Sequence, residues 1–90
     1  MKENIKKIGV ISILRYNHLP VDAIVFDKKT IREKEVQHKI YHLLEEINSN
    51  KMILINLAIK NKNTDEIIDI TSVMFRDEVS RFKEMINNHF

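Results

Sequence analysis

The order of its hydrophobic patterns constrains the fold of this chain more than any other feature. Two short segments rich in β-branched residues, 8–16 and 21–27, precede a stretch with helical periodicity. The same order then recurs, with expected strands over 51–60 and 66–71 followed by a second helical stretch. This pattern predicts an α+β fold of order ββαββα, with a four-stranded, mostly antiparallel sheet, two amphipathic helices and two similar ββα halves.

Each predicted helix has an apolar stripe. The first stripe consists of Val36, Ile40, Leu43, Leu44 and Ile47. Thr30 is followed three residues later by Glu33, which is the spacing of a capping box, so we expect this helix to run from Thr30 to Asn48. The second stripe consists of Phe75, Val79, Phe82 and Ile86, with Met85 beside it. We expect that helix to begin near Ser72, although residues 70–75 fit a longer strand equally well.

The length and composition limit both the size and the chemistry of the protein. Ninety residues with 43% hydrophobic and 31% charged content predict one small α/β domain spanning residues 1–90. The chain has no cysteine and a single glycine, Gly9, which excludes disulfides, thiolate catalysis, a phosphate-binding loop and a nucleophile elbow. We therefore expect a protein that is not an enzyme and that has no cofactor.

The location expected from the sequence is the cytoplasm. The longest apolar run, residues 9–14, is too short to span a membrane, and no signal-peptide cleavage pattern follows it. The absence of cysteine is also compatible with a reducing compartment. No membrane partner is expected.

The first two strands predict a sheet that is apolar on both faces. If Tyr16 faces Val21, then Arg15 opposes Asp22, and the pairs Ile13–Ile24 and Ile11–Phe26 share one face. The other face would carry Val10, Leu14, Tyr16, Val21 and Val25. ββα units of the same hand tend to place their helices on one side, which leaves this second face for a partner. We expect a homodimer or a second protein there; the alternative is cover by the chain's own terminal segments.

Basic residues are expected to gather at one end of the sheet. The first strand begins there, the second and third strands end there, and the first helix begins there. The cations at this basic pole are Lys6, Lys7, Lys28, Lys29, Arg32, Lys60 and Lys62. The net charge is only +2, so nucleic-acid binding by the basic pole is an alternative function and not the leading one.

A histidine pair is the only metal-binding pattern that we single out. His38 and His42 lie four residues apart on the first predicted helix, with Glu35 and Glu45 on the same stripe. This stripe lies opposite the apolar one, so side-chain contacts on a solvated helix face are the simpler interpretation. The leading prediction is thus a small intracellular protein-interaction or regulatory protein that acts as a homodimer through an apolar sheet face.

Overall fold

In a computed structural model of the chain, residues 6–15, 20–48 and 53–90 are described. They form six main elements in the order β1 (Lys7–Arg15), β2 (Pro20–Phe26), α1 (Lys34–Asn48), β3 (Ile53–Asn61), β4 (Ile67–Val73) and α2 (Val79–His89). Short 3-10 turns, Thr30–Arg32 and Arg76–Glu78, precede the two helices. The predicted α+β class is confirmed, with a four-stranded antiparallel sheet and two helices.

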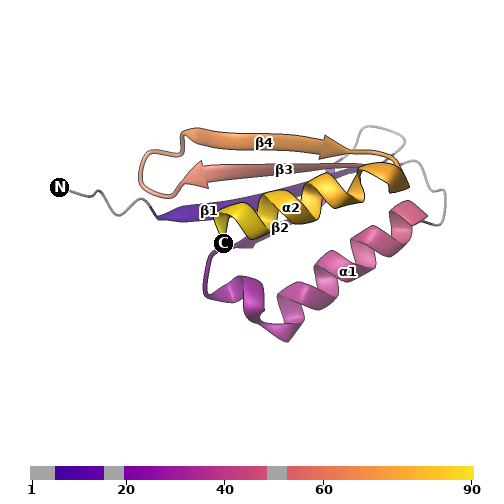
Figure 1. Ribbon diagram of the computed structural model, residues 1–90, viewed down its shortest axis with the longest axis horizontal. Helices are drawn as coiled ribbons and strands as arrows, with labels where there is room; N and C mark the ends of the chain where they lie inside the picture. Colours follow the sequence, from indigo (N-terminus) through magenta and orange to yellow (C-terminus); the bar gives the residue numbers. More distant parts are fainter. Residues whose placement is uncertain (1–5, 16–19, 49–52) are drawn as a thin grey trace.

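The strand order in the sheet is β2-β1-β3-β4, and every neighbouring pair is antiparallel (Figure 1). The first strand therefore lies in the centre, next to β2 on one side and β3 on the other. The edge strands are β2 and β4. No helix among the described residues is long and apolar enough to cross a membrane.

Both helices pack on one face of the sheet (Figure 1). The side chains of β3 alternate strictly, with Ile53, Ile55, Leu57 and Ile59 buried and the residues between them half-exposed. The buried cluster joins these residues to Ile11, Ile13, Ile24, Phe26 and Val73 of the other strands and to Leu43, Ile47, Phe82 and Met85 of the helices. The expectation that both helices lie on the same side is met, and within the described ranges no helix lies against the opposite face.

The register predicted for the first hairpin is wrong by two residues. Ile11 pairs with Ile24 and Gly9 pairs with Phe26, whereas Asp22 stands opposite Ile13 and not opposite Arg15. A shift of two residues keeps every side chain on its predicted face, so the alternation alone cannot detect it. The physical reason lies at Gly9, where an added Cβ would be 2.6 Å from Cε2 and 2.8 Å from Cε1 of the Phe26 ring. The ring occupies space that only glycine leaves free.

The first helix begins later than its predicted cap. Thr30 lies in the 3-10 turn, and the reciprocal hydrogen bonds are made with Asp27: the Asp27 amide donates to Thr30 Oγ1, and the Thr30 amide donates to Asp27 Oδ1. The helix itself starts at Lys34, later than predicted, and ends at Asn48, which is the predicted end. The reciprocal bonds therefore stabilise the turn before the helix, and they lie three residues earlier in the sequence than the predicted capping box.

The second helix also begins later, at Val79 instead of Ser72. Strand β4 extends to Val73, which is the alternative that the sequence left open. Phe75 is 64% exposed and does not belong to the helical stripe, although Phe82 and Met85 are buried as expected. Glu78 explains this boundary, because its Oε2 accepts from the amides of Met74 and Phe75 and holds the chain in a turn before the helix.

Candidate functional site

The face of the sheet opposite the helices is the first candidate site. We define this open face by its described residues, which are Ile8, Val10, Ser12, Leu14, Ala23, Val25, Leu54, Asn56, Ala58, Lys60, Ile70 and Ser72. One row of paired residues crosses all four strands, from Val25 through Val10 and Ala58 to Ile70. Val25 and Ile70, at the two ends of that row, are 60% and 57% exposed.

Polar groups on the open face are few and mostly neutral. The next row runs from Ala23 through Ser12 and Asn56 to Ser72, and the Ser72 hydroxyl donates to Asn56 Oδ1 at 2.6 Å. Lys60 is the one charged residue on the open face as defined above, and its ammonium lies 3.8 Å from Asp65 in the turn beyond the sheet. The centre of the face therefore carries no charge that would have to be desolvated on contact.

The open face is large for an exposed apolar surface. Four strands about 4.8 Å apart and about seven residues long span a flat outline of roughly 400 Å². Protruding side chains expose more area than that outline. Contiguous apolar patches above a few hundred Å² mark interaction sites in many proteins.

The residues predicted to bind a partner fall on the open face where their side chains are described. Val10 and Leu14 are half-buried on it, and Val25 is exposed at its β2 edge. Val21 lies at an irregularity in the β1–β2 pairing, between the partners of Ile13 and Leu14. Tyr16 lies outside the described residues.

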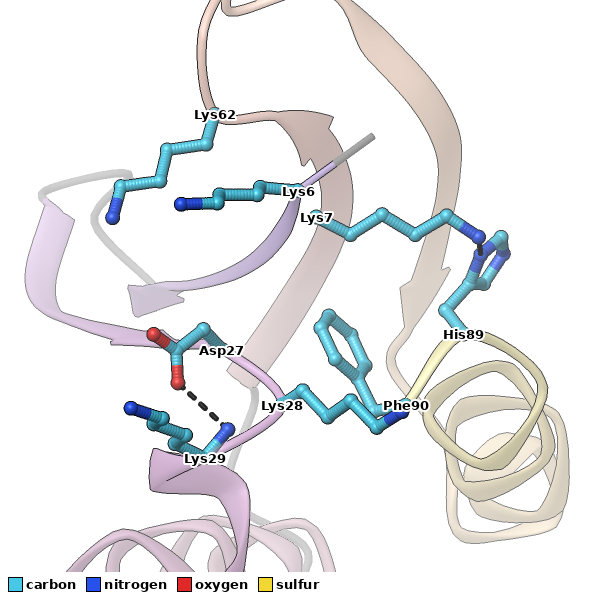
Figure 2. Close-up of a pocket in the computed structure, with 8 residues that line it drawn as sticks. All are labelled: Lys6, Lys7, Asp27, Lys28, Lys29, Lys62, His89 and Phe90. Carbon is cyan, nitrogen blue, oxygen red and sulfur yellow. Dashed lines mark hydrogen bonds between the residues drawn. The ribbon is translucent and has the colours of Figure 1, made fainter. Parts of the chain in front are cut away.

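The second candidate site is a pocket at the end of the sheet where β1 begins and β2 and β3 end (Figure 2). It has a volume of about 550 Å³ and is lined by Lys6, Lys7, Asp27, Lys28, Lys29, Lys62, His89 and Phe90. We call it the basic pocket. Five of the seven cations of the predicted basic pole line it. Arg32 and Lys60 are not among the lining residues.

Asp27 is the one acidic residue that lines the basic pocket, and its carboxylate is engaged by the backbone. Its Oδ1 accepts from the amides of Lys29 and Thr30, both at 2.9 Å. The Thr30 amide, followed by the Lys29 amide and the nearby Lys62 ammonium, lowers the pKa of Asp27 below its usual value. The carboxylate fixes the turn that carries Lys28 and Lys29.

Lys7 is held at the wall of the pocket by a short chain of hydrogen bonds. Its Nζ lies 3.3 Å from Nδ1 of His89, and Nε2 of His89 lies 3.1 Å from Oδ2 of Asp69 (Figure 2 shows the first contact). Both contacts are satisfied when Nε2 carries the imidazole proton and Nδ1 accepts from the ammonium. The histidine bond lowers the pKa of Asp69 below its usual value.

Sequence reasoning missed the contribution of α2 to the basic pocket. Neither His89 nor Phe90 is among the residues predicted for the basic pole. The ring of Phe90 packs edge-on against Phe26, with centroids 5.1 Å apart, which places the end of α2 beside the end of β2, and the Lys7–His89 contact places it beside the start of β1. The direction of the chain was the available signal, because a helix that follows the fourth strand begins at the opposite end of the sheet and runs back toward the end where β1 begins.

The predicted metal ligands do not converge. His38, Glu35 and Glu45 are exposed on α1, and His42 Nε2 lies 3.7 Å from Glu46. Within the described ranges, no group of three or more histidine, aspartate or glutamate residues could hold a metal ion. The arrangement offers no site with metal-binding geometry in that part of the chain.

Comparison of the chain with protein-family models, with curated proteins and with solved structures finds no match.

Proposed function

We propose that this protein is a small, non-enzymatic interaction protein that works as a homodimer through its open face. The observation that carries the proposal is the row Val25–Val10–Ala58–Ile70, an apolar band across all four strands with no helix against it. A domain of this size buries a small core, so self-association adds substantially to its stability. The predicted similarity of the two ββα halves supports the same arrangement, since units of like hand place both helices on one side.

A second copy of the chain fits the open face better than a charged partner does. The face is nearly neutral, so two copies meet without burying unpaired charges. Two sheets that pack face to face form a sandwich with interdigitating side chains, about 10 Å apart. The exposed β4 side chains beside the face, Ile67, Ile68 and Met74, extend the apolar surface available to a second copy, and a standard interface needs roughly 800 Å² per partner.

The charge distribution favours one orientation of the two copies. The basic pocket lies at one end of the sheet, so parallel strands would place two clusters of lysines side by side. A two-fold axis perpendicular to the strands places the clusters at opposite ends of the dimer. Like-charge repulsion therefore favours the antiparallel arrangement.

The test is a measurement of mass in solution by sedimentation equilibrium. We expect the wild-type chain to have twice its monomer mass of 10.7 kDa. The double variant Val25→Lys/Ile70→Lys places a charge at each end of the apolar row, on side chains that are already exposed in the monomer. Burial of these unpaired charges at the interface weakens association by about 100-fold or more.

The matched control is Tyr41→Lys, which makes the same kind of change at a side chain that is 63% exposed on α1, away from the sheet. It should leave the dimer intact. A wild-type chain that is monomeric at high concentration overturns the proposal. So does a dimer that the Val25→Lys/Ile70→Lys variant leaves unchanged, because the copies would then meet elsewhere.

A further inference from the structure

We infer that the basic pocket binds a small molecule that carries two or more linked phosphate groups, such as a nucleoside di- or triphosphate. This inference is independent of the proposed dimer, because the pocket lies at the end of the sheet and not on its open face. Its lysines come from three separate connections of the fold: Lys6 and Lys7 from the start of β1, Lys28 and Lys29 from the turn after β2, and Lys62 from the turn after β3.

Within the described ranges, no carboxylate forms an ion pair with the ammonium groups of the pocket. The ion pairs of lysine and arginine among the described residues involve Lys39, Lys60 and Arg81, and none of these lines the pocket. Asp27 is the one acid in the lining, and one of its oxygens is occupied by two backbone amides. Five lysines thus line one cavity with one side-chain carboxylate among its lining residues, and this excess of positive charge favours an anionic ligand.

Among the described residues, the hydrogen bonds around the basic pocket hold its lysines in place and do not pair their ammonium groups with carboxylates. Asp27 fixes the turn that carries Lys28 and Lys29, and the Lys62 amide donates to the Lys6 carbonyl, which joins two of the three connections. His89 accepts from Lys7 while Asp69 accepts from His89. In Figure 2 the side chains of Lys6 and Lys62 extend in the same direction above Asp27.

The size and shape of the pocket favour a small polyphosphate over a nucleic-acid strand. A cavity of about 550 Å³ lies within the range of small-molecule sites. Several cations from different directions match an anion with several phosphate groups better than a single phosphate. A strand would need cations along a groove and aromatic side chains for successive bases. The open face offers Lys60 alone among its defined residues. The aromatic side chains that line the pocket are Phe90 and His89, and both nitrogens of the His89 ring are already bonded, to Lys7 and to Asp69.

Phe90 gives the pocket an apolar wall for the organic part of the ligand. Its ring lines the cavity and is held edge-on by Phe26. In Figure 2 the ring lies between Lys7 and Lys28. A ligand with phosphates on the lysines and a planar or apolar group against Phe90 would use both features.

The test is isothermal titration calorimetry at low salt with four probes: inorganic triphosphate, ATP, orthophosphate, and a single-stranded oligonucleotide of about 12 nucleotides. We expect triphosphate and ATP to bind with one site per chain, and orthophosphate to bind at least about tenfold more weakly. The double variant Lys28→Gln/Lys62→Gln should lose about 100-fold in affinity for triphosphate. The control Lys39→Gln/Lys83→Gln makes the same charge change on exposed positions of α1 and α2 and should bind as the wild type does.

Three results would overturn the inference. The first is the absence of triphosphate binding at about 20 mM salt, where electrostatic binding is strongest. The second is an equal loss in the control variant, which would assign the binding to net charge. The third is an oligonucleotide affinity that exceeds that of triphosphate and rises with length, which would assign the basic pocket to nucleic acid. Sedimentation equilibrium on the same variants shows whether each one is still a dimer, so a loss of triphosphate binding can be told apart from a loss of the dimer.

Discussion

Gly9 determines which residues of β1 and β2 stand opposite each other, because the Phe26 ring lies over its backbone. The sequence correctly placed Ile11, Ile13, Ile24 and Phe26 on the core face, since alternation depends only on whether a position is odd or even. It could not fix the pairing, because registers that differ by two residues bury the same side chains. The single glycine opposite a large aromatic side chain was the signal that would have decided it.

Replacement of Gly9 by alanine should destabilise the protein by about 1–3 kcal/mol, because the new methyl group overlaps the Phe26 ring and the packed core must shift. Thermal or urea unfolding measures the change. Ser12→Ala is the control on the same strand, since Ser12 lies on the open face, and we expect it to change stability little.

A double-mutant cycle tests whether the ring itself is the cause. In a Phe26→Leu background the same Gly9→Ala change should cost clearly less, because the smaller side chain leaves space for the methyl group. An equal cost in both backgrounds would refute the role of Phe26 in fixing the register.

At the scale of elements, the sequence predicted which face of each helix is buried more accurately than it predicted the residue at which each helix begins. The stripe of α1 packs on the core as expected, but the reciprocal side-chain hydrogen bonds join Asp27 and Thr30 at the 3-10 turn before the helix, and not the expected pair Thr30 and Glu33. The start of α2 was misplaced because Phe75 fits the helical spacing. In the structure the Glu78 carboxylate accepts hydrogen bonds from the Met74 and Phe75 amides, which keeps these residues out of the helix. A side chain that bonds backbone amides in place of a helical turn leaves no trace in the hydrophobic periodicity of the sequence.

Glu78→Ala should loosen the connection between β4 and α2. The Met74 and Phe75 amides hold the pKa of Glu78 below the ordinary glutamate value of 4.5, with Arg81 adding a smaller effect. A lowered pKa in the folded state means that the stabilisation is complete above pH 4.5 and is lost as the pH falls through the folded-state pKa. We expect the free energy of unfolding of Glu78→Ala to lack the contribution that the wild type loses as the pH falls through the folded-state pKa of Glu78.

Amide hydrogen exchange at Met74 and Phe75 provides the direct measurement, and both amides should exchange faster in Glu78→Ala. Glu84→Ala, at an exposed position of α2, is the control. Unchanged exchange at both amides would mean that the turn does not depend on the Glu78 carboxylate.

At the scale of the whole molecule, the prediction of where charges gather is more accurate than the prediction of any single contact. The direction of each strand places the start of β1 and the ends of β2 and β3 at one pole, and five of the seven predicted cations line one pocket there. The part played by α2 was missed, because His89 and Phe90 reach the pole only through the packing of the helix across the sheet. The open face was predicted from the same alternation that predicted the core.

A dimer through the open face makes the stability of the fold depend on protein concentration. We expect the melting temperature of the wild type to rise when the concentration is raised about 100-fold, because association is linked to folding. The Val25→Lys/Ile70→Lys variant should melt at a temperature independent of concentration. A wild-type melting temperature that stays constant over this range would contradict the linkage.

The central place of β1 also has a consequence for synthesis. This strand is made before α1 and β3, yet one of its two hydrogen-bonding edges is matched only by β3, after the whole of α1 has been made. During that interval a hairpin with an unpaired edge is exposed in the nascent chain, which is the condition that invites pairing with other chains. The speed with which β3 reaches β1 thus governs how much of the newly made protein escapes aggregation.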